Sequence, residues 1–477
     1  MASAAGPSSR RIGGSFRDPA GYVFAREGRI FRAVDEATTE HLRALEQAGV
    51  LPRLIESGAI VGTRFVEDPA LRSALAEEHA PFATFLEHDV LSTLSYPYEW
   101  TISMIADAGL ATLEVQERAL DAAASLKDAT AFNIQFVNGR PVFIDLGSFE
   151  RPPRLDVWFA LGQFNQMFVF PLLLCVHHGW DPRAYFLPRL AGRSVEDVAR
   201  TLGRLERWGP RALFDVTLPL VLNRAAQKQT QVDRSLLDRP NPDARPQRLQ
   251  IDRLRGKLTK LAASYRPAGT WSDYERTCTY TDSAEEAKKT LVRRFLEARR
   301  PRRVLDLGCN TGDYSRIAAD CGARVIAADG DHDAVEILYR RLRRERADIA
   351  PMVIDITNPS PAIGYLNQER PSFLERLDAD CVLGLALLHH LLISGNLSLA
   401  AARDLFCALT GDLLVLEFVP TEDPMFRRML QFRRDLFQGI DLAACKQVFG
   451  ERFRLLEEHA IEGSPRTLLF YAREAAP

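Results

Sequence analysis

The stretch from Val304 to Gly312 constrains the fold more than any other part of this chain. It reads Val-Leu-Asp-Leu-Gly-Cys-Asn-Thr-Gly, an apolar run that ends in a glycine-containing turn, and a helical segment follows at 313–319. A second apolar run, 324–328, ends on Asp329, where a carboxylate can accept both hydroxyl groups of a ribose. A strand, a glycine turn, a helix and a second strand with a terminal acid form the first half of a nucleotide-binding, doubly wound α/β sheet.

The turn differs from the turn of dinucleotide-binding proteins, which carries three glycines. Here the pattern is Gly308-x-Asn310-x-Gly312, and Ser315 stands in the place of the third glycine. Asp306 lies two residues before the first glycine, inside the strand. A carboxylate there would repel a pyrophosphate, whereas it would attract a sulfonium ligand that carries a free amino group. The acid therefore favours S-adenosylmethionine over NAD.

Residues 270–477 resemble a class I S-adenosylmethionine-dependent methyltransferase. The glycine turn is similar to that family's first motif, with Asn310 in place of the usual middle glycine, and asparagine tolerates a positive φ better than most residues. The resemblance implies that Asp355 bonds the adenine amino group and that Ile356 packs on the adenine ring. The expected cofactor-binding residues are therefore Asp306, Gly308, Asn310, Gly312, Asp329, Asp355 and Ile356.

Further apolar runs continue the predicted sheet in order. They lie at 351–356, 380–386 and 412–418, and a closing antiparallel pair is expected at 452–456 and 467–471. We therefore expect an α/β fold with a Rossmann-like sheet of seven strands. The other interpretation of the acids at the strand ends is helix capping and turn formation, which aspartate performs routinely.

Two adjacent histidines are candidates for the chemistry. His389 and His390 follow the expected fourth strand, at the carboxyl edge of the sheet where a base would lie. Methyl transfer needs a general base only when the acceptor group is protonated. Adjacent residues on a helix point about 100° apart, so at most one imidazole should face the substrate. Both could equally be structural residues at the start of a helix, and Glu417 is a weaker second candidate.

Length and composition limit the number of domains and the kinds of partner that this protein can have. A chain of 477 residues suggests two or three domains of about 150 residues each. The net charge of −2 provides no strong field toward DNA or a membrane, so we expect a small-molecule substrate and leave the oligomeric state open. The seven cysteines have no metal-ligand spacing, which predicts reduced thiols in a cytoplasmic protein and no bound metal ion at the cysteines.

The sequence also suggests domain boundaries. The first residues have no apolar segment typical of a signal peptide, and a proline-rich stretch at 238–246 reads as an exposed connector. Trp271, Tyr274 and Tyr280 are expected either to cover the cofactor as a lid or to pack on the sheet. The predicted parts are a disordered lead at 1–15, an α+β domain at 16–230, a linker with a basic helix at 231–270, and the methyltransferase domain at 271–477.

A cluster in the N-terminal half resembles the catalytic centre of protein-kinase-like folds. Asp128 and Asn133 lie five residues apart before a hairpin with an Asn-Gly turn, and Asp145-Leu-Gly follows that hairpin. The resemblance implies that Asp128 positions an acceptor hydroxyl and that Asn133 and Asp145 hold Mg²⁺ and ATP. The sequence departs from the pattern because the expected third strand, 63–66, has no lysine. The alternative is that Asp128 and Asp145 cap turns.

Three functions are compatible with these patterns. The favoured one is methyl transfer to a small molecule, with an N-terminal domain that covers or selects the substrate. The second is a bifunctional protein whose N-terminal domain also transfers phosphate. In the third, the N-terminal domain is a binding module that recruits a protein or RNA substrate.

Overall fold

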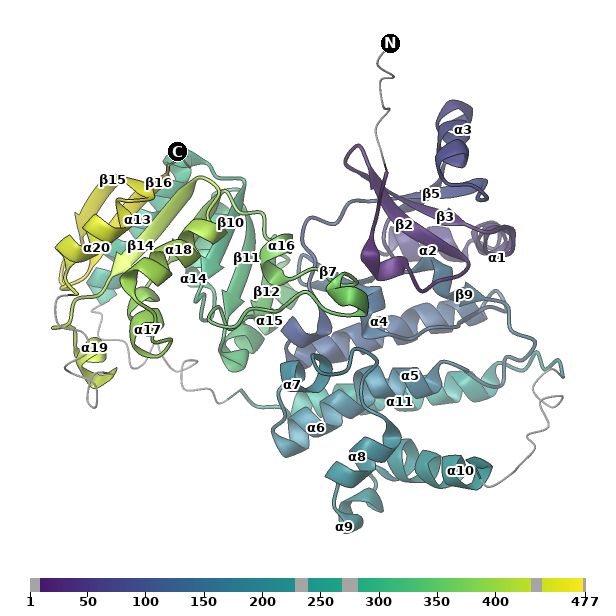
Figure 1. Ribbon diagram of the computed structural model, residues 1–477. Coiled ribbons are helices and arrows are strands. Elements are labelled where there is room, and N and C mark those ends of the chain that lie inside the picture. Colours follow the sequence, from purple (N-terminus) through teal and green to yellow (C-terminus); the bar gives the residue numbers. More distant parts are fainter. Residues whose placement is uncertain (1–8, 228–238, 268–281, 430–439, 475–477) are drawn as a thin grey trace. The chain divides into compact units, whose positions relative to one another are not determined.

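The chain forms two compact units, which we describe separately (Figure 1). The computed structural model describes residues 9–227, 239–267, 282–429 and 440–474. The first unit comprises Met1–Phe136, Pro141–Arg266 and Ala362–Arg370, and the second comprises Val137–Arg140, Pro267–Pro361 and Pro371–Pro477. The expected lid residues Trp271, Tyr274 and Tyr280 lie outside the described residues.

The second unit contains the predicted seven-stranded sheet, in the order β12-β11-β10-β13-β14-β16-β15. Strands β10 to β14 are parallel, and β16 runs antiparallel to both β14 and β15. The chain leaves β10 in one direction for β11 and β12, then returns to the other side of β10 for β13, which is the switch point where such sheets bind ligands. The strands are β10 (Arg303–Leu307), β11 (Arg324–Asp329), β12 (Ile349–Val353), β13 (Cys381–Gly384), β14 (Leu413–Phe418), β15 (Phe453–Ala460) and β16 (Thr467–Arg473).

Helices cover both faces of this sheet, because alternate residues of each strand point to opposite sides. Val304 and Val325 pack in one apolar cluster with α13, α14 and α15, whereas Leu305 packs in a second cluster with α17, α18 and α20. Burial on both faces explains why the central strands are apolar throughout. The helices are α13 (Asp282–Arg299), α14 (Asp313–Asp320), α15 (His332–Glu345), α16 (Phe373–Arg376), α17 (Leu388–Ile393), α18 (Leu399–Leu409), α19 (Pro424–Met429) and α20 (Leu442–Phe449).

The first unit begins with a five-stranded antiparallel sheet in the order β1-β2-β3-β5-β4. The expectation of a disordered lead at 1–15 is wrong for its last residues, because Arg10–Arg11 pairs with β2 and Gly13–Ser15 forms a short 3-10 helix. The strands are β1 (Arg10–Arg11), β2 (Gly21–Arg26), β3 (Arg29–Val34), β4 (Thr63–Phe65) and β5 (Thr84–His88). Three helices lie between these strands, namely α1 (Glu36–Gln47), α2 (Val50–Glu56) and α3 (Pro69–Glu78).

The rest of the first unit is mainly helical around the long helix α4 (Ile102–Leu120). The expected Asn-Gly hairpin is present as β7 (Ile134–Val137) and β8 (Arg140–Phe143), with positive φ at Asn138 and Gly139, although its tip, Val137–Arg140, belongs to the second unit. A second small pair is β6 (Ser125–Leu126) with β9 (Phe149–Glu150). The remaining helices are α5 (Leu161–Phe164), the π-helix η5 (Asn165–Val169), α6 (Phe170–His178), α7 (Pro182–Phe186), α8 (Val195–Thr201), α9 (Arg204–Arg207), the π-helix η6 (Leu213–Thr217) and α10 (Leu218–Gln227).

Helix α11 (Arg245–Ser264), which the sequence placed in a linker, belongs to the first unit and contacts α4 and α6. Ile251, Leu254 and Leu258 are buried at helical spacing on one face. Its basic residues also have structural partners, because Arg253 bonds the buried carboxylate of Asp215 at 2.8 Å. None of the helices in the described ranges is both long and apolar enough to span a bilayer.

A short segment from the C-terminal half, Ala362–Arg370, also belongs to the first unit. Arg17 donates to Glu369 at 3.0 Å, and the ring of Phe16 stacks on Tyr365 with centroids 5.3 Å apart. The first unit is therefore assembled from segments that lie more than three hundred residues apart in the chain, as the separation of 352 residues between Arg17 and Glu369 shows.

Candidate functional site

The glycine turn after β10 has the backbone conformation that its sequence predicted. Gly308, Asn310 and Gly312 all have positive φ, at 74°, 48° and 88°. The φ of 88° favours glycine at position 312, and a Cβ atom there would lie 2.5 Å from Cδ1 of Leu338 in α15, so the Leu338 side chain would have to move. Asn310 adopts the positive φ that was expected of it. The turn therefore passes close under the carboxyl edge of the sheet.

Asp329, at the end of β11, is held by backbone donors. Its Oδ2 accepts a hydrogen bond from the N–H of Asn310 at 2.8 Å, and its Oδ1 accepts from the N–H of Asp331 at 2.8 Å. No basic side chain of the described residues forms an ion pair with it. Burial raises the pKa of this carboxyl above its usual range, and the charge of Asp331 adds to that shift.

Asp306 is buried inside β10, with only 2% of its surface exposed. Its Oδ2 accepts a hydrogen bond from Oγ of Ser315 in α14 at 2.6 Å. Burial raises the pKa of Asp306 to about 6, although the Ser315 bond acts in the opposite direction, and the neighbouring charge of Asp329 raises it further. The carboxylates of Asp306 and Asp329 lie close enough for the charge of Asp329 to raise the pKa of Asp306, so this edge attracts a cationic ligand.

Asp355 and Ile356 follow β12, which ends at Val353 rather than at 356 as expected. Asp355 is exposed and accepts hydrogen bonds from the N–H and the hydroxyl of Thr357, at 2.9 and 2.7 Å. These bonds form a turn, as the alternative interpretation of this acid predicted. Ile356 is buried in the apolar cluster beside the sheet. Both residues lie at the same carboxyl edge as the glycine turn.

The two candidate histidines occupy different environments in α17. His389 is 1% exposed, and neither ring nitrogen has a hydrogen-bond partner among the described residues. Burial lowers the pKa of His389 far below its usual value. His390 is only partly buried, and burial with the nearby charge of Arg466 lowers its pKa to about 4. Both imidazoles are therefore neutral at neutral pH, and only His390 reaches the surface.

The turn before these histidines lies against the glycine turn. A Cβ atom on Gly308 would be 3.3 Å from Cδ1 of Leu387, which directly precedes α17. The structure therefore brings the start of α17 close to the expected cofactor site. His389 packs between the rings of His390 and Phe426, with centroids 4.2 and 6.0 Å away, so it occupies the interior side of this helix.

A buried network of four charged side chains lies at the end of β14. Glu417, which is fully buried, bonds Lys288 of α13 at 2.5 Å and Arg466 at 3.2 Å. Arg466 also bonds Asp423 at 2.7 Å. Glu417 was a candidate base, but its position between two cations suits a positioning role instead. Sequence reasoning missed Lys288 and Arg466, because each lies in a segment whose charges resemble ordinary surface charges.

A small cavity adjoins this network, with a volume of about 150 Å³. Its walls come from the segment after β14 and from the loops before α20 and β16. Phe418 and Pro465 provide apolar surface, whereas Glu422 and Asp441 provide carboxylates. The cavity therefore offers a mixed apolar and acidic surface at the carboxyl end of β14.

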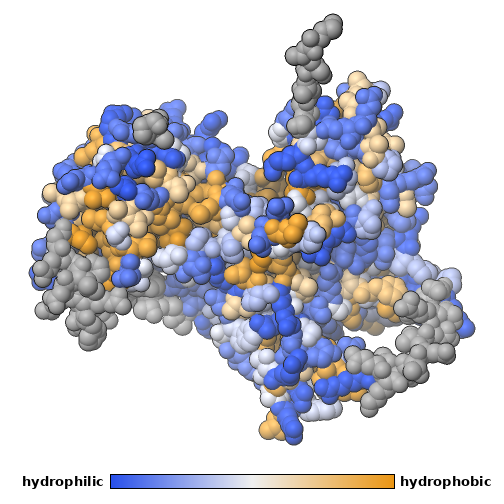
Figure 2. Space-filling view, in the orientation of Figure 1, coloured by the Kyte–Doolittle hydropathy of each residue, from blue (hydrophilic) through white to orange (hydrophobic). Residues whose placement is uncertain are grey.

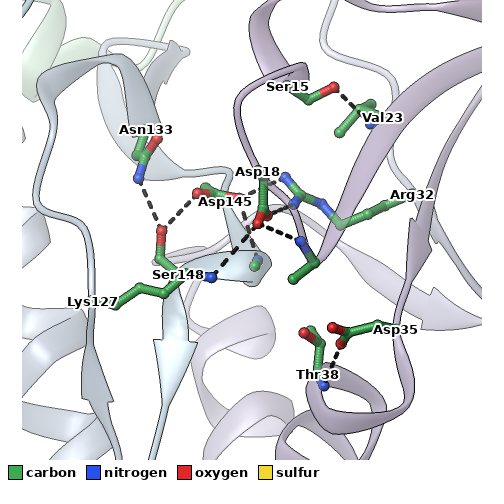
Figure 3. Close-up of polar contacts among 12 residues, drawn as sticks. Ser15, Asp18, Val23, Arg32, Asp35, Thr38, Lys127, Asn133, Asp145 and Ser148 are labelled. Carbon is green, nitrogen blue, oxygen red and sulfur yellow. Dashed lines mark hydrogen bonds and ion pairs between the residues drawn. The ribbon is translucent and has the colours of Figure 1, made fainter.

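The first unit contains a separate polar cluster that includes Asn133 and Asp145, two of the predicted kinase-like residues (Figure 3). Arg32 on β3 donates to Oδ1 of Asp145 at 2.5 Å and to Oδ2 of Asp18 at 3.5 Å. Lys127 lies 3.7 Å from Asp18. The expected third strand, 63–66, is the edge strand β4, and the cation that bonds Asp145 lies on β3 instead. The cation is Arg32, 113 residues before its partner Asp145.

The predicted trio Asp128, Asn133 and Asp145 comes together in this cluster. Asn133 donates to Oγ of Ser148 at 3.1 Å, and Ser148 donates to Oδ2 of Asp145 at 2.6 Å (Figure 3). The Arg32 guanidinium helps to hold the pKa of Asp145 below its usual range despite burial. By contrast, burial and the charge of Asp145 raise the pKa of Asp128.

Two features of the cluster disfavour a magnesium ion. The Arg32 guanidinium compensates the charge of Asp145, and both oxygens of this carboxylate already accept hydrogen bonds, whereas Mg²⁺ takes several oxygen ligands. The described residues also contain no group of three or more acidic, histidine or cysteine side chains arranged to hold a metal ion. Sequence spacing drew attention to the carboxylate of Asp145 and the amide of Asn133, but it could not reveal Arg32, which lies far away in the sequence.

Comparison with known proteins gives the relationship of the whole chain. It is 33% identical over 483 residues to nodulation protein NoeA of Rhizobium meliloti (strain 1021), covering 98% of both chains. The chain belongs to the NoeA family of nodulation proteins. No protein-family model matches the chain.

Several solved structures are similar to part of the chain. The N-methyltransferase NodS from Bradyrhizobium japonicum WM9 is 16% identical, with 41% of this chain and 98% of NodS covered and a TM-score of 0.31. The magnesium protoporphyrin IX methyltransferase ChlM from Synechocystis PCC 6803 is 16% identical, with 45% and 99% covered and a TM-score of 0.32. The bifunctional kinase-methyltransferase WbdD is 20% identical, with 40% of each chain covered and a TM-score of 0.29.

The fold assignment rests on the strand order of this chain and not on those matches. Five parallel strands in the order β12-β11-β10-β13-β14, closed by the antiparallel strands β16 and β15, carry the glycine turn after the central strand β10. The second unit of this NoeA-family protein has the α/β, Rossmann-like seven-stranded fold that the sequence predicted.

Proposed function

We propose that the protein binds S-adenosylmethionine at the carboxyl edge of its seven-stranded sheet and methylates a small-molecule acceptor. The observation that carries the proposal is the state of Asp329, whose carboxylate is oriented by two backbone N–H groups and has no basic partner among the described residues. Such a carboxylate remains able to accept hydrogen bonds from ribose hydroxyl groups. It lies beside the glycine turn, where the backbone leaves room for a ligand.

The other expected cofactor residues have complementary roles in this proposal. Asp306 supplies negative charge below the glycine turn, which favours a ligand that carries an ammonium and a sulfonium group. Gly308 and Gly312 allow close approach of the backbone. Asp355 and Ile356 supply an acceptor and an apolar contact for the adenine. When bound, the cofactor supplies the methyl group for an in-line displacement.

His390 is the proposed base if the acceptor carries a proton. Its imidazole is neutral at neutral pH, because its pKa is lowered to about 4, and it is partly exposed near the glycine turn. Its Nδ1 or Nε2 can therefore accept the proton that the acceptor loses. His389 is proposed to position the helix start from the interior side. The test is the turnover of His390→Gln, which should fall about 100-fold with unchanged cofactor affinity.

A small-molecule acceptor is supported by charge and by size. The net charge of −2 provides no general attraction for nucleic acid. The cavity of about 150 Å³ beside the buried network has the scale of one chemical group and not of a macromolecular surface. Its carboxylates, Glu422 and Asp441, favour hydroxyl or amine groups of an acceptor over anionic groups.

Calorimetric titration of S-adenosylmethionine and S-adenosylhomocysteine tests the cofactor site. Asp329→Ala should weaken both about 100-fold, since two hydrogen bonds to a charged acceptor contribute about 3 kcal/mol together. Asp348→Ala is the matched control, because this exposed aspartate precedes β12 at the opposite, amino edge of the same sheet. Absence of binding to the wild-type protein would refute the proposal, as would equal affinities in the wild type and Asp329→Ala.

For the first unit we propose acceptor selection rather than phosphate transfer. The ion pair between Arg32 and Asp145 supports this choice, because it neutralises the carboxylate that a metal ion would need. Titration with ATP in the presence and absence of Mg²⁺ separates the two functions. Acceptor selection predicts no magnesium-dependent binding of ATP. Magnesium-dependent binding that disappears in Asp145→Asn would establish the bifunctional alternative instead.

A further inference from the structure

The segment around α9 and α10 exposes an unusual amount of apolar surface. Six large apolar side chains between residues 205 and 222 are each 46–92% exposed. We call them the apolar patch; its members are Leu205, Trp208, Phe214, Leu218, Val221 and Leu222. Apolar surface is also visible in the region of these helices in the space-filling view (Figure 2). Contiguous exposed apolar side chains of this size mark interaction surfaces in soluble proteins.

The patch follows the helix made by η6 and α10. Phe214, Leu218 and Leu222 recur at intervals of four residues and therefore share one face. The opposite face is also apolar, because Val216 and Leu220 are buried against the rest of the unit. A helix that is apolar on both faces needs a second partner for its outer face. The turn that carries Trp208 lies beside this helix, since the hydroxyl of Thr217 donates to the carbonyl of Arg207 at 2.5 Å.

The polar residues around the patch are cationic. Arg204, Arg211 and Arg224 are exposed, and none of them has an ion pair among the described residues. The two acids of this segment are already bound. Glu206 contacts His178 at 2.9 Å, and Asp215 is buried against Arg253 and Lys257. The patch thus presents apolar and aromatic side chains within a positively charged surface.

We propose that the apolar patch docks the protein on the surface of an anionic lipid bilayer. A helix that lies in the membrane interface combines tryptophan, phenylalanine and leucine on its buried side with arginine at the edges, which is the composition found here. Each basic residue near an anionic membrane adds about 1 kcal/mol of attraction. The helix lies on the bilayer and does not cross it. The expectation of no membrane partner came from the charge of the whole chain, whereas docking depends on this local surface.

Charge also decides against two other occupants. A second copy of the chain on a two-fold axis would place the patch against itself, so its arginines would face one another with no exposed acid to compensate. A nucleic acid would satisfy the arginines, but the aliphatic side chains Leu205 and Leu222 would find no apolar partner in it. An anionic bilayer satisfies both the cationic and the apolar parts.

Vesicle cosedimentation of the full chain tests the proposal. The protein should bind vesicles of phosphatidylcholine with phosphatidylglycerol, and it should bind vesicles of phosphatidylcholine alone at least about ten-fold more weakly. The double variant Trp208→Ala and Phe214→Ala should lose about ten-fold or more in affinity, because both rings leave the bilayer. The double variant Arg204→Gln and Arg211→Gln should lose the preference for anionic vesicles. Val90→Ala, which changes an exposed apolar residue outside the patch, should bind like the wild type.

Two outcomes would overturn the proposal. One is equal sedimentation of the wild type and the double variant Trp208→Ala and Phe214→Ala with anionic vesicles. The other is a wild-type dimer in lipid-free solution that the same double variant converts to a monomer, since a second copy would then cover the patch. Because all the substituted side chains are exposed, the variants should keep their folded circular dichroism spectrum, and binding of S-adenosylmethionine provides a separate readout of the methyltransferase domain.

Discussion

Asp329 and Asp145 are both partly buried aspartates at the end of a β-strand or shortly after it, but their bonding partners differ. In the second unit, Asp329 accepts hydrogen bonds from two backbone N–H groups, and burial raises its pKa. In the first unit, Asp145 bonds the guanidinium of Arg32 and the hydroxyl of Ser148, and its pKa is lowered. The first carboxylate keeps an uncompensated charge, whereas the charge of the second is neutralised within the protein.

The difference indicates which site is prepared for a ligand. A buried carboxylate without a cationic partner is unfavourable for stability, and a ligand that offers hydroxyl or ammonium groups can relieve it. The charge of a carboxylate that already bonds a cation is compensated, so a further ligand would stabilise it only a little. The edge near Asp329 is therefore the proposed binding site, whereas the cluster around Asp145 holds β3 and the segment before β9 together.

Removal of the Arg32 guanidinium should cause the largest change in the stability of the protein. Arg32→Leu should lower the free energy of unfolding by about 3–5 kcal/mol, because it leaves the charge of Asp145 buried without its partner. The measurement is urea unfolding at pH 7. The double variant with Asp145→Asn should recover most of the loss, since it removes the stranded charge. Arg64→Leu is the control and should cost less than about 1 kcal/mol, because the Arg64 side chain is 66% exposed.

The pH dependence of the same variant gives a second check on the ion pair. In the wild type the pKa of Asp145 is lowered, so its contribution to stability is present above the unfolded pKa of about 3.9 and is lost as the pH falls below that value. In Arg32→Leu, the guanidinium that lowers the pKa of Asp145 is absent. The gap in stability between the two proteins should therefore narrow in acid, and a constant gap between pH 7 and pH 3 would contradict the assignment.

The titration of Asp306 is expected to have a smaller effect, on the affinity for S-adenosylmethionine. Its pKa of about 6 means that the carboxyl is mostly neutral at pH 5 and ionised at pH 7.5. A cationic cofactor favours the ionised form, so calorimetry should find S-adenosylmethionine about ten-fold weaker at pH 5 than at pH 7.5. Asp306→Asn should bind more weakly at pH 7.5 and should lose this dependence. The same pH slope in Asp306→Asn would assign the titration to another group.

Stability of the ligand-free protein should change with pH in the opposite direction. The folded pKa of Asp306 lies above the unfolded value, so the buried charge lowers stability above pH 6, and this penalty disappears as the pH falls from about 6 to 4. The wild type should therefore gain stability relative to Asp306→Asn over this range. Thermal unfolding of both proteins without cofactor measures the difference.

Substitution of the buried histidines should cause the smallest changes in the free energy of unfolding. His389→Leu should change the free energy of unfolding by less than about 1 kcal/mol, because neither ring nitrogen of His389 has a hydrogen-bond partner among the described residues. His88→Leu in the first unit is the matched substitution and should cost about 1–2 kcal/mol, since it removes the contact between Nδ1 and Oγ1 of Thr63 at 2.8 Å. Urea unfolding of both variants measures the contrast. A larger loss for His389→Leu would assign His389 a bonded structural role.

Local patterns in the sequence determined the fold of the second unit. Apolar runs of strand length, the glycine turn and the acids at the strand ends predicted the seven-stranded sheet, and Asn310 has the positive φ that its side chain permits. These features depend on neighbours within a few residues, so the sequence displays them directly. The Asn-Gly hairpin and the spacing of Asp128, Asn133 and Asp145 were readable for the same reason.

Contacts between distant segments were decided only by the tertiary structure. Arg32 lies 113 residues from Asp145, and Arg466 lies 49 residues from Glu417, so no local spacing indicates either pair. The segment 362–370 joins the first unit although its neighbours in sequence belong to the second. A charged residue looks the same in sequence whether it is solvated or buried against a partner. The fold alone determined which acids are neutralised and which remain available to bind.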